Sequence, residues 1–90
     1  MLQLQAMKLP RTRNSWLERL LIDDAFDAYL EWRDESAEVW RAYKRWNGAP
    51  VREAGTEFYA YHAALEREEH AAHAYGTIVS RLGASAARAR

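Results

Sequence analysis

The chain has 90 residues, 13 of them basic and 13 acidic, so its formal net charge is zero. It contains no cysteine, which excludes a disulfide scaffold and any site built on thiolates. Apolar residues make up 49% of the chain and glycine and proline are scarce, as is typical of a small globular domain rich in helix. No apolar run is long enough to cross a membrane and no signal peptide is recognisable, so we expect a cytoplasmic protein.

Residues 1–14 are expected to form a loose basic tail. They carry three basic residues and no acid, and Pro10 should interrupt a helix there. The next four residues, Ser15 to Glu18, fit a capping box, in which the serine hydroxyl and the glutamate carboxylate each accept a hydrogen bond from a backbone amide. The first helix is therefore predicted to begin at residue 15.

Residues 15–46 are predicted to form one long helix. Apolar and aromatic residues recur there at spacings of three and four, and neither glycine nor proline interrupts the pattern. The stripe expected to face the core consists of Ile22, Ala25, Phe26, Tyr29, Trp32, Arg33, Ser36, Val39, Trp40, Tyr43 and Trp46.

Residues 47–50 are predicted to be a turn, because Gly48 suits a left-handed helix cap and Pro50 suits the first position of a new helix. The second helix is predicted over residues 50–82, followed by a short tail at 84–90. Its expected core stripe is Val51, Ala54, Phe58, Tyr61, Leu65, Glu68, Ala72, Tyr75, Val79 and Leu82. A short connection makes the two helices antiparallel neighbours, so the predicted fold is an all-α two-helix hairpin.

The chain carries more apolar surface than two single stripes can bury. A domain of this size has a marginal core of its own, and association is the simplest remedy. We therefore expect a homodimer that forms a four-helix bundle, with a thicker monomer core as the alternative. The residues expected at the shared interface are Trp16, Leu20, Trp32, Trp40, Trp46, Tyr61 and Tyr75.

Two charged residues, Arg33 and Glu68, interrupt the otherwise apolar stripes. Folding the chain back at the turn brings them within about one helical turn of each other, roughly 6 Å along the axis. We expect a partly buried ion pair between them, formed within the chain or across the dimer, which fixes the helix register more than it adds stability.

A row of imidazoles and carboxylates lies along one face of the second predicted helix. Its members are His62, Glu66, Glu69 and His73. The simplest interpretation is a solvated face with ordinary helical pairs, and a pH-sensitive region is another. The segment 65–71 also slightly resembles the second helix of encapsulated ferritins, which implies a metal site, although the Glu-x-x-His pair of such sites is absent.

Catalytic patterns are thin, so we expect neither enzymatic activity nor a cofactor. The serines lack a glycine-rich elbow, and the four glycines are scattered rather than gathered in a phosphate-binding loop. Aromatic and basic residues meet near the turn, as they do in many nucleic-acid binders. The zero net charge makes a protein partner the better expectation there, because a dedicated nucleic-acid binder is usually basic.

Trp46-Asn47-Gly48 forms a Trp-x-Gly motif between two long predicted helices. In this the chain resembles the Trp-x-Gly family of small type VII secretion substrates, which are helical hairpins that pair as dimers. The resemblance implies that Trp46 and Gly48 form the turn motif and that the protein is exported as a folded dimer without a cleaved signal peptide. The Tyr-x-x-x-Asp/Glu export signal of that family is absent here, so a partner would supply it.

The sequence as a whole predicts a non-enzymatic helical hairpin that acts by self-association and by binding an unidentified protein. Two alternatives remain open, an exported type VII hairpin and a metal-binding bundle protein. Neither a membrane nor a nucleic acid is an expected partner.

Overall fold

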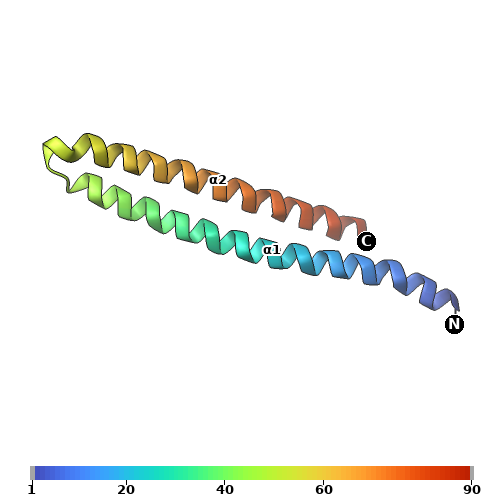
Figure 1. The fold of residues 1–90 in the computed structure, drawn as a ribbon. Coiled ribbons are helices and arrows are strands. Elements are labelled where there is room, and N and C mark those ends of the chain that lie inside the picture. The colour runs from blue at the N-terminus through green and yellow to red at the C-terminus, as the bar shows by residue number, and fades with distance from the viewer. Residues whose placement is uncertain (1, 90) are drawn as a thin grey trace.

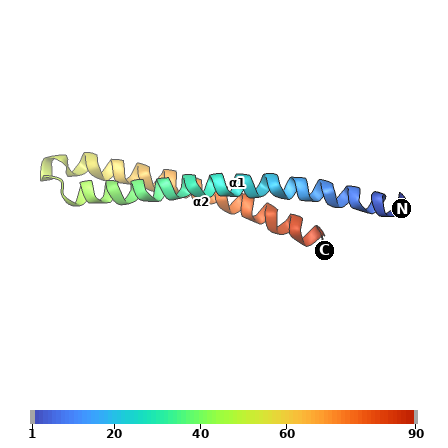
Figure 2. The same cartoon turned by 90° about the horizontal axis from the view of Figure 1, so that it is seen from below.

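The chain folds into two long helices joined by a short turn, as the computed structural model shows (Figure 1). The structure describes the backbone of residues 2–89 and the side chains of residues 16–88. Helix α1 spans Leu2–Asn47, and helix α2 spans Val51–Ala89. They run side by side in opposite directions and cross at a shallow angle (Figure 1, Figure 2). The described residues contain no strand, so the predicted all-α hairpin is confirmed.

The chain reverses at Gly48–Pro50, inside the predicted turn. The Gly48 N–H donates to the Lys44 carbonyl at 3.1 Å and the Ala49 N–H to the Trp46 carbonyl at 3.2 Å, which satisfies two of the carbonyls at the end of α1. The Pro50 carbonyl accepts from the Glu53 N–H at 2.9 Å and opens α2. The left-handed cap predicted at Gly48 is wrong, since no described glycine has a positive φ. In place of that cap, the Gly48 N–H makes an ordinary helical hydrogen bond to the carbonyl four residues earlier.

Both predicted tails are wrong, because the helices extend through them. Helix α1 already begins at Leu2, so Ser15 lies inside it and has no helix start to cap. Helix α2 continues past Gly83 to Ala89. A proline inside a helix costs about 3 kcal/mol and a glycine about 1 kcal/mol relative to alanine, but each cost is local and the surrounding residues are mostly good helix formers. Residues 1 and 90 of the two predicted tails lie outside the described residues.

The contact between α1 and α2, which we call the seam, has alanine at its most buried points. Ala42 and Ala64 are each 1% exposed, Ala71 is 8% exposed, and no large side chain among residues 16–88 is fully buried. Because a methyl group is so small, alanine lets two helix backbones approach closely. The two long helices together make a rod of 76 × 15 × 13 Å. Its radius of gyration is 21.0 Å, whereas a compact chain of this length has about 12 Å.

Candidate interaction surface

Two aromatic clusters join α1 to α2 across the seam. Near the turn, the Trp46 ring stacks on Tyr61 at 5.5 Å between centroids and meets Phe58 edge-on at 5.3 Å. Farther from the turn, Trp32 stacks on Tyr75 at 5.7 Å. Stacked and edge-on pairs at these distances are favourable beyond the area they bury. Four residues that the sequence assigned to a dimer interface, Trp32, Trp46, Tyr61 and Tyr75, therefore pack within the hairpin itself.

The other three residues of the predicted interface, Trp16, Leu20 and Trp40, are exposed. Trp40 is 58% exposed even though its ring stacks on Tyr43 at 5.8 Å and the Lys44 Nζ lies 5.6 Å from the ring centre. These three side chains therefore remain available to a partner.

One side of the hairpin presents exposed and half-buried apolar side chains from both helices, and we call it the apolar face. Its members are Ile22, Phe26, Tyr29, Trp40 and Tyr43 of α1 and Phe58, Leu65 and Val79 of α2. Two aromatic contacts connect the helices beside this face: the Tyr43 and Tyr61 rings lie 5.8 Å apart, and the Tyr29 and Tyr75 rings lie 5.8 Å apart. Ile22, Phe26, Tyr29 and Tyr75 also line one shallow hollow. The apolar face therefore extends over both helices.

The predicted core stripe of α1 is wrong for several of its members, because the helix is rotated relative to the expectation. Phe26 is 61% exposed, and Ile22 and Trp40 are exposed as well. Trp32 and Val39 of the predicted stripe do lie at the seam. They are joined there by Leu21, Ala28 and Ala42, which the stripe did not include. Neighbouring residues on a helix are about 100° apart, so spacings of three and four identify a broad apolar arc without showing which edge of it meets α2.

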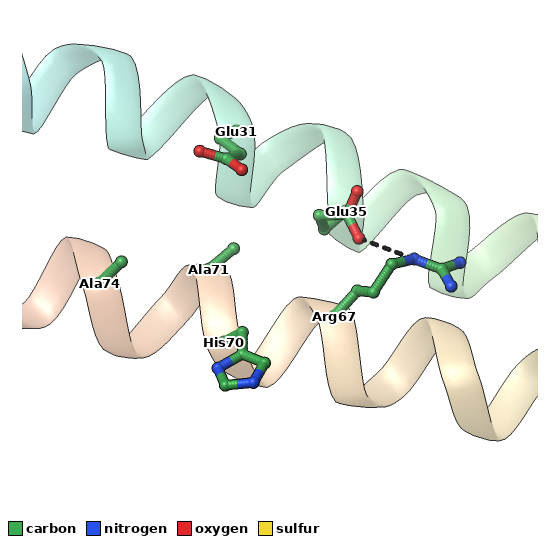
Figure 3. A pocket seen from close by; sticks show the side chains of 6 residues that line it. All are labelled: Glu31, Glu35, Arg67, His70, Ala71 and Ala74. Atoms are coloured by element: carbon green, nitrogen blue, oxygen red, sulfur yellow. Dashed lines mark hydrogen bonds and ion pairs between the residues drawn. The ribbon is translucent and has the colours of Figure 1, made fainter.

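The opposite side of the hairpin is polar and is shown in Figure 3. Glu31 and Glu35 of α1 lie across a shallow groove from Arg67 of α2 (Figure 3). His70, Ala71 and Ala74 also line this groove. The Arg67 Nε donates to the Glu35 Oε2 at 3.2 Å. Nearer the turn, a second pair between the helices joins Arg45 to Glu57 at 3.6 Å. Exposed pairs contribute only about 0–1 kcal/mol each, so these two mainly fix how the helices align along the seam.

The ion pair predicted between Arg33 and Glu68 does not form within the chain. Glu68 lies at the seam and accepts a hydrogen bond from the Trp32 Nε1 at 3.3 Å. Arg33 is exposed on the apolar side, with its guanidinium 6.0 Å from the centre of the Tyr29 ring. The cause is again rotation, because Arg33 follows Trp32 by one residue and so points about 100° away from the seam.

The candidate metal ligands line the outer surface of α2. His62 Nδ1 lies 3.4 Å from Glu66 Oε1, and both side chains are exposed. Glu66, Glu69 and His73 line a shallow hollow together with His70, which was not among the candidate ligands. Within the described residues, no three His, Asp or Glu side chains come close enough together to hold a metal ion. What the structure brings together here is a helical His–Glu pair.

Comparison of the chain with protein-family models, with curated proteins and with solved structures finds no match. Neither helix is long and apolar enough, over the residues described, to cross a membrane. The apolar face is thus the feature of the molecule on which a functional proposal can be built.

Proposed function

We propose that this chain is a non-enzymatic helical hairpin that acts by self-association through its apolar face and by binding a further protein. The aromatic and aliphatic side chains of the apolar face are of the kind that anchor protein interfaces, where tryptophan and tyrosine contribute most of the binding energy. The opposite side of the hairpin, with the groove between Glu35 and Arg67, provides a solvated polar surface.

The observation that carries this proposal is the accessible surface of the single hairpin, which is 7505 Å². A compact protein of the same mass exposes about 5,400 Å². The excess of about 2,100 Å² is larger than the roughly 800 Å² that each partner buries in a standard protein interface. Association through the apolar face would remove much of this excess while leaving the seam unchanged.

The test is the mass of the purified chain in solution, measured by light scattering during size-exclusion chromatography. We expect at least a dimer for the natural sequence. Phe26→Ser removes an aromatic side chain from the apolar face, so this variant should shift the distribution towards the monomer. Tyr59→Ser is the matched control, because Tyr59 is more exposed than Phe26 but lies outside the apolar face. A natural chain that is monomeric at every concentration would overturn the proposal.

A second candidate is export as a type VII-like hairpin, and it is favoured by the position of the Trp-x-Gly motif. Trp46 lies in the last turn of α1, and Gly48 begins the reversal of the chain. The experiment is to follow the tagged chain in its native cell and to measure the culture supernatant and the cell pellet separately. Retention of the chain in the pellet, while a known export substrate reaches the supernatant, would exclude this candidate.

A further inference from the structure

We infer that the occupant of the apolar face is a second copy of this chain, packed with both turns at the same end of a four-helix bundle and with Arg33 of each copy paired to the partner's Glu69. This inference rests on the proposed self-association and specifies its geometry. Each helix would then pack against the opposite helix of the partner, α1 against α2, so that all neighbouring helices are antiparallel.

The charges at the two edges of the apolar face differ in sign. On the α1 edge, the guanidinium of Arg33 is held beside the Tyr29 ring. On the α2 edge, Glu69 follows Leu65 by four residues and precedes Ala72 by three, and therefore lies on the same side of the helix as both. Both Arg33 and Glu69 are exposed. One copy thus carries a basic side chain at one edge of the apolar face and an acidic side chain at the other edge.

The two charges also lie at similar heights along the rod. With a rise of about 1.5 Å per residue, Arg33 is about 21 Å from the end of α1 at the turn, and Glu69 is about 27 Å from the start of α2. A long side chain such as arginine can span the difference of about one turn. A twofold axis parallel to the rod places the α1 edge of one copy along the α2 edge of the other, and it therefore forms two equivalent Arg33–Glu69 pairs.

The same twofold axis also brings apolar side chains of the two copies together at equal distances from the turn. Trp40 and Phe58 both lie about 10 Å from the turn, on α1 and α2 respectively, so Trp40 of one copy meets the partner's Phe58. Ile22 and Gly76 both lie about 37 Å from the turn, and a Cβ built on Gly76 would meet no atom within 4 Å. The partner's Gly76 therefore leaves room for the Ile22 side chain, as a large residue facing a small one requires in a packed core.

The other face-to-face arrangement has the turns at opposite ends, and the charges oppose it. A twofold axis perpendicular to the rod lays α1 along the partner's α1 and α2 along the partner's α2. When the two apolar faces are centred on each other, the axis crosses the rod about 20 Å from the turn. Each Arg33 then lies near the partner's Arg33 and each Glu69 near the partner's Glu69. Like charges that face each other across an interface are destabilising, so the pattern of charge selects the arrangement with the turns together.

The decisive measurement is the distance between the two turns, and the absence of natural cysteine makes it direct. A spin label on Asn47→Cys sits on the last residue of α1, and electron–electron dipolar spectroscopy measures the separation of the two labels. Helices packed about 8–10 Å apart with the turns together give a label separation of about 15–30 Å. Turns at opposite ends give about 45 Å or more, since the apolar face extends over roughly 40 Å. A label on Asp34→Cys, about 20 Å from the turn and so near the middle of the apolar face, is the control and should give a short distance in either dimer.

The mass in solution and the distance between the turns together distinguish three outcomes. A dimeric mass with a short distance between the turns supports the inference. A dimeric mass with a long distance overturns the inference and leaves the proposed self-association intact. A monomeric mass without a dipolar signal from either label overturns both.

A charge exchange tests the pairing itself. Arg33→Glu and Glu69→Arg should each raise the dimer dissociation constant about three- to tenfold, because each change replaces two attractive contacts with repulsive ones at an exposed edge. The double variant restores both pairs with reversed charges, so its dissociation constant should return to within about twofold of the natural chain. A double variant that dimerises no better than either single variant would overturn the pairing of Arg33 with Glu69.

Discussion

Glu68 is a half-buried carboxylate at the seam of an otherwise apolar and alanine-rich contact. The sequence predicted that it would need a partner, and the structure supplies one in the Trp32 indole N–H. The identity of that partner could not be predicted, because Trp32 and Arg33 are adjacent in the sequence and differ only in the direction in which they leave the helix. A rotation of about 100° decides between an ion pair and a hydrogen bond from an indole.

Replacing Trp32 should reveal both roles of this side chain in stability. Trp32→Phe keeps a ring beside Tyr75 but removes the donor to Glu68, so we expect a loss of about 1 kcal/mol in the free energy of unfolding. Trp32→Ala also leaves a cavity and should lose about 3 kcal/mol. Urea unfolding measures both changes. Trp16→Phe, at an exposed tryptophan, is the control. Equal losses in the free energy of unfolding for Trp16→Phe and Trp32→Phe would contradict the role of Trp32 at the seam.

Gly48 should tolerate a side chain despite its place in the turn. A Cβ added there would lie 3.5 Å from the Lys44 carbonyl oxygen, which is ordinary contact, and the backbone has no positive φ. We therefore expect Gly48→Ala to leave stability within about 0.5 kcal/mol or to raise it by up to about 1 kcal/mol. Gly55→Ala, inside α2, is the comparison. A loss of more than about 1 kcal/mol at Gly48 alone would show that the turn requires glycine.

The titration of Glu38 should depend on its ion pair with Arg41. The hydrogen bond from the Arg41 guanidinium, and then its charge, lower the pKa of the Glu38 carboxyl below its ordinary value. A pKa that is lower in the folded state means that the pair stabilises the fold above the unfolded-state pKa and loses this effect as the pH falls through the folded-state pKa. Followed by NMR, the Glu38 carboxyl should titrate at a lower pH in the natural chain than in Arg41→Gln. Equal midpoints would contradict this.

The helices themselves were the most predictable part of the molecule, and their ends and rotation the least. Spacings of three and four over long segments fix the helical state, and Asn47 to Pro50 fixes the place of the turn. The position of each helix end depends on a balance. The unfavourable helix propensity of a residue such as Pro10 or Gly83 is set against the helix already formed on one side of it. The predicted stripes contained the seam residues Trp32 and Tyr75. They did not contain the buried Ala42, Ala64 and Ala71, because a small residue contributes little to an apolar pattern.

The seam should not tolerate a larger side chain at Ala64. Leucine at this position would push α2 away from α1, and overpacking of this kind costs about 1–3 kcal/mol. Ala63→Leu is a matched control one residue away, since Ala63 is exposed whereas Ala64 is 1% exposed. Thermal or urea unfolding of the two variants measures the difference. If both variants are equally stable, the alanines do not mark the closest approach of the helices.

The whole molecule is an extended rod with one apolar side and one polar side. From the sequence we could predict that a single hairpin is too small to cover its aromatic residues. The aromatic residues that remain uncovered are set by how each helix is rotated about its own axis. This rotation is known only from the structure. The predicted dimer is therefore retained as a proposal, but with a different set of contact residues from the one first expected.

An associating hairpin should show a melting temperature that depends on protein concentration. Binding of a second copy stabilises the folded chain by mass action, so each increase in concentration should raise Tm. We expect a rise of several degrees between about 1 and 100 μM, measured by circular dichroism, and no such rise for a variant that has lost the apolar face. A Tm that stays constant over this range would indicate a monomer.

The unequal burial of the four tryptophans gives the protein its own optical probes. Trp32 and Trp46 lie between the helices of a lone hairpin, whereas Trp16 and Trp40 are open to solvent. A collisional quencher such as iodide should therefore reach about half of the indole emission of the isolated chain. When two rods meet, Trp40 should withdraw from the quencher and its emission should move to shorter wavelength, so that assembly can be followed by fluorescence without attaching any dye.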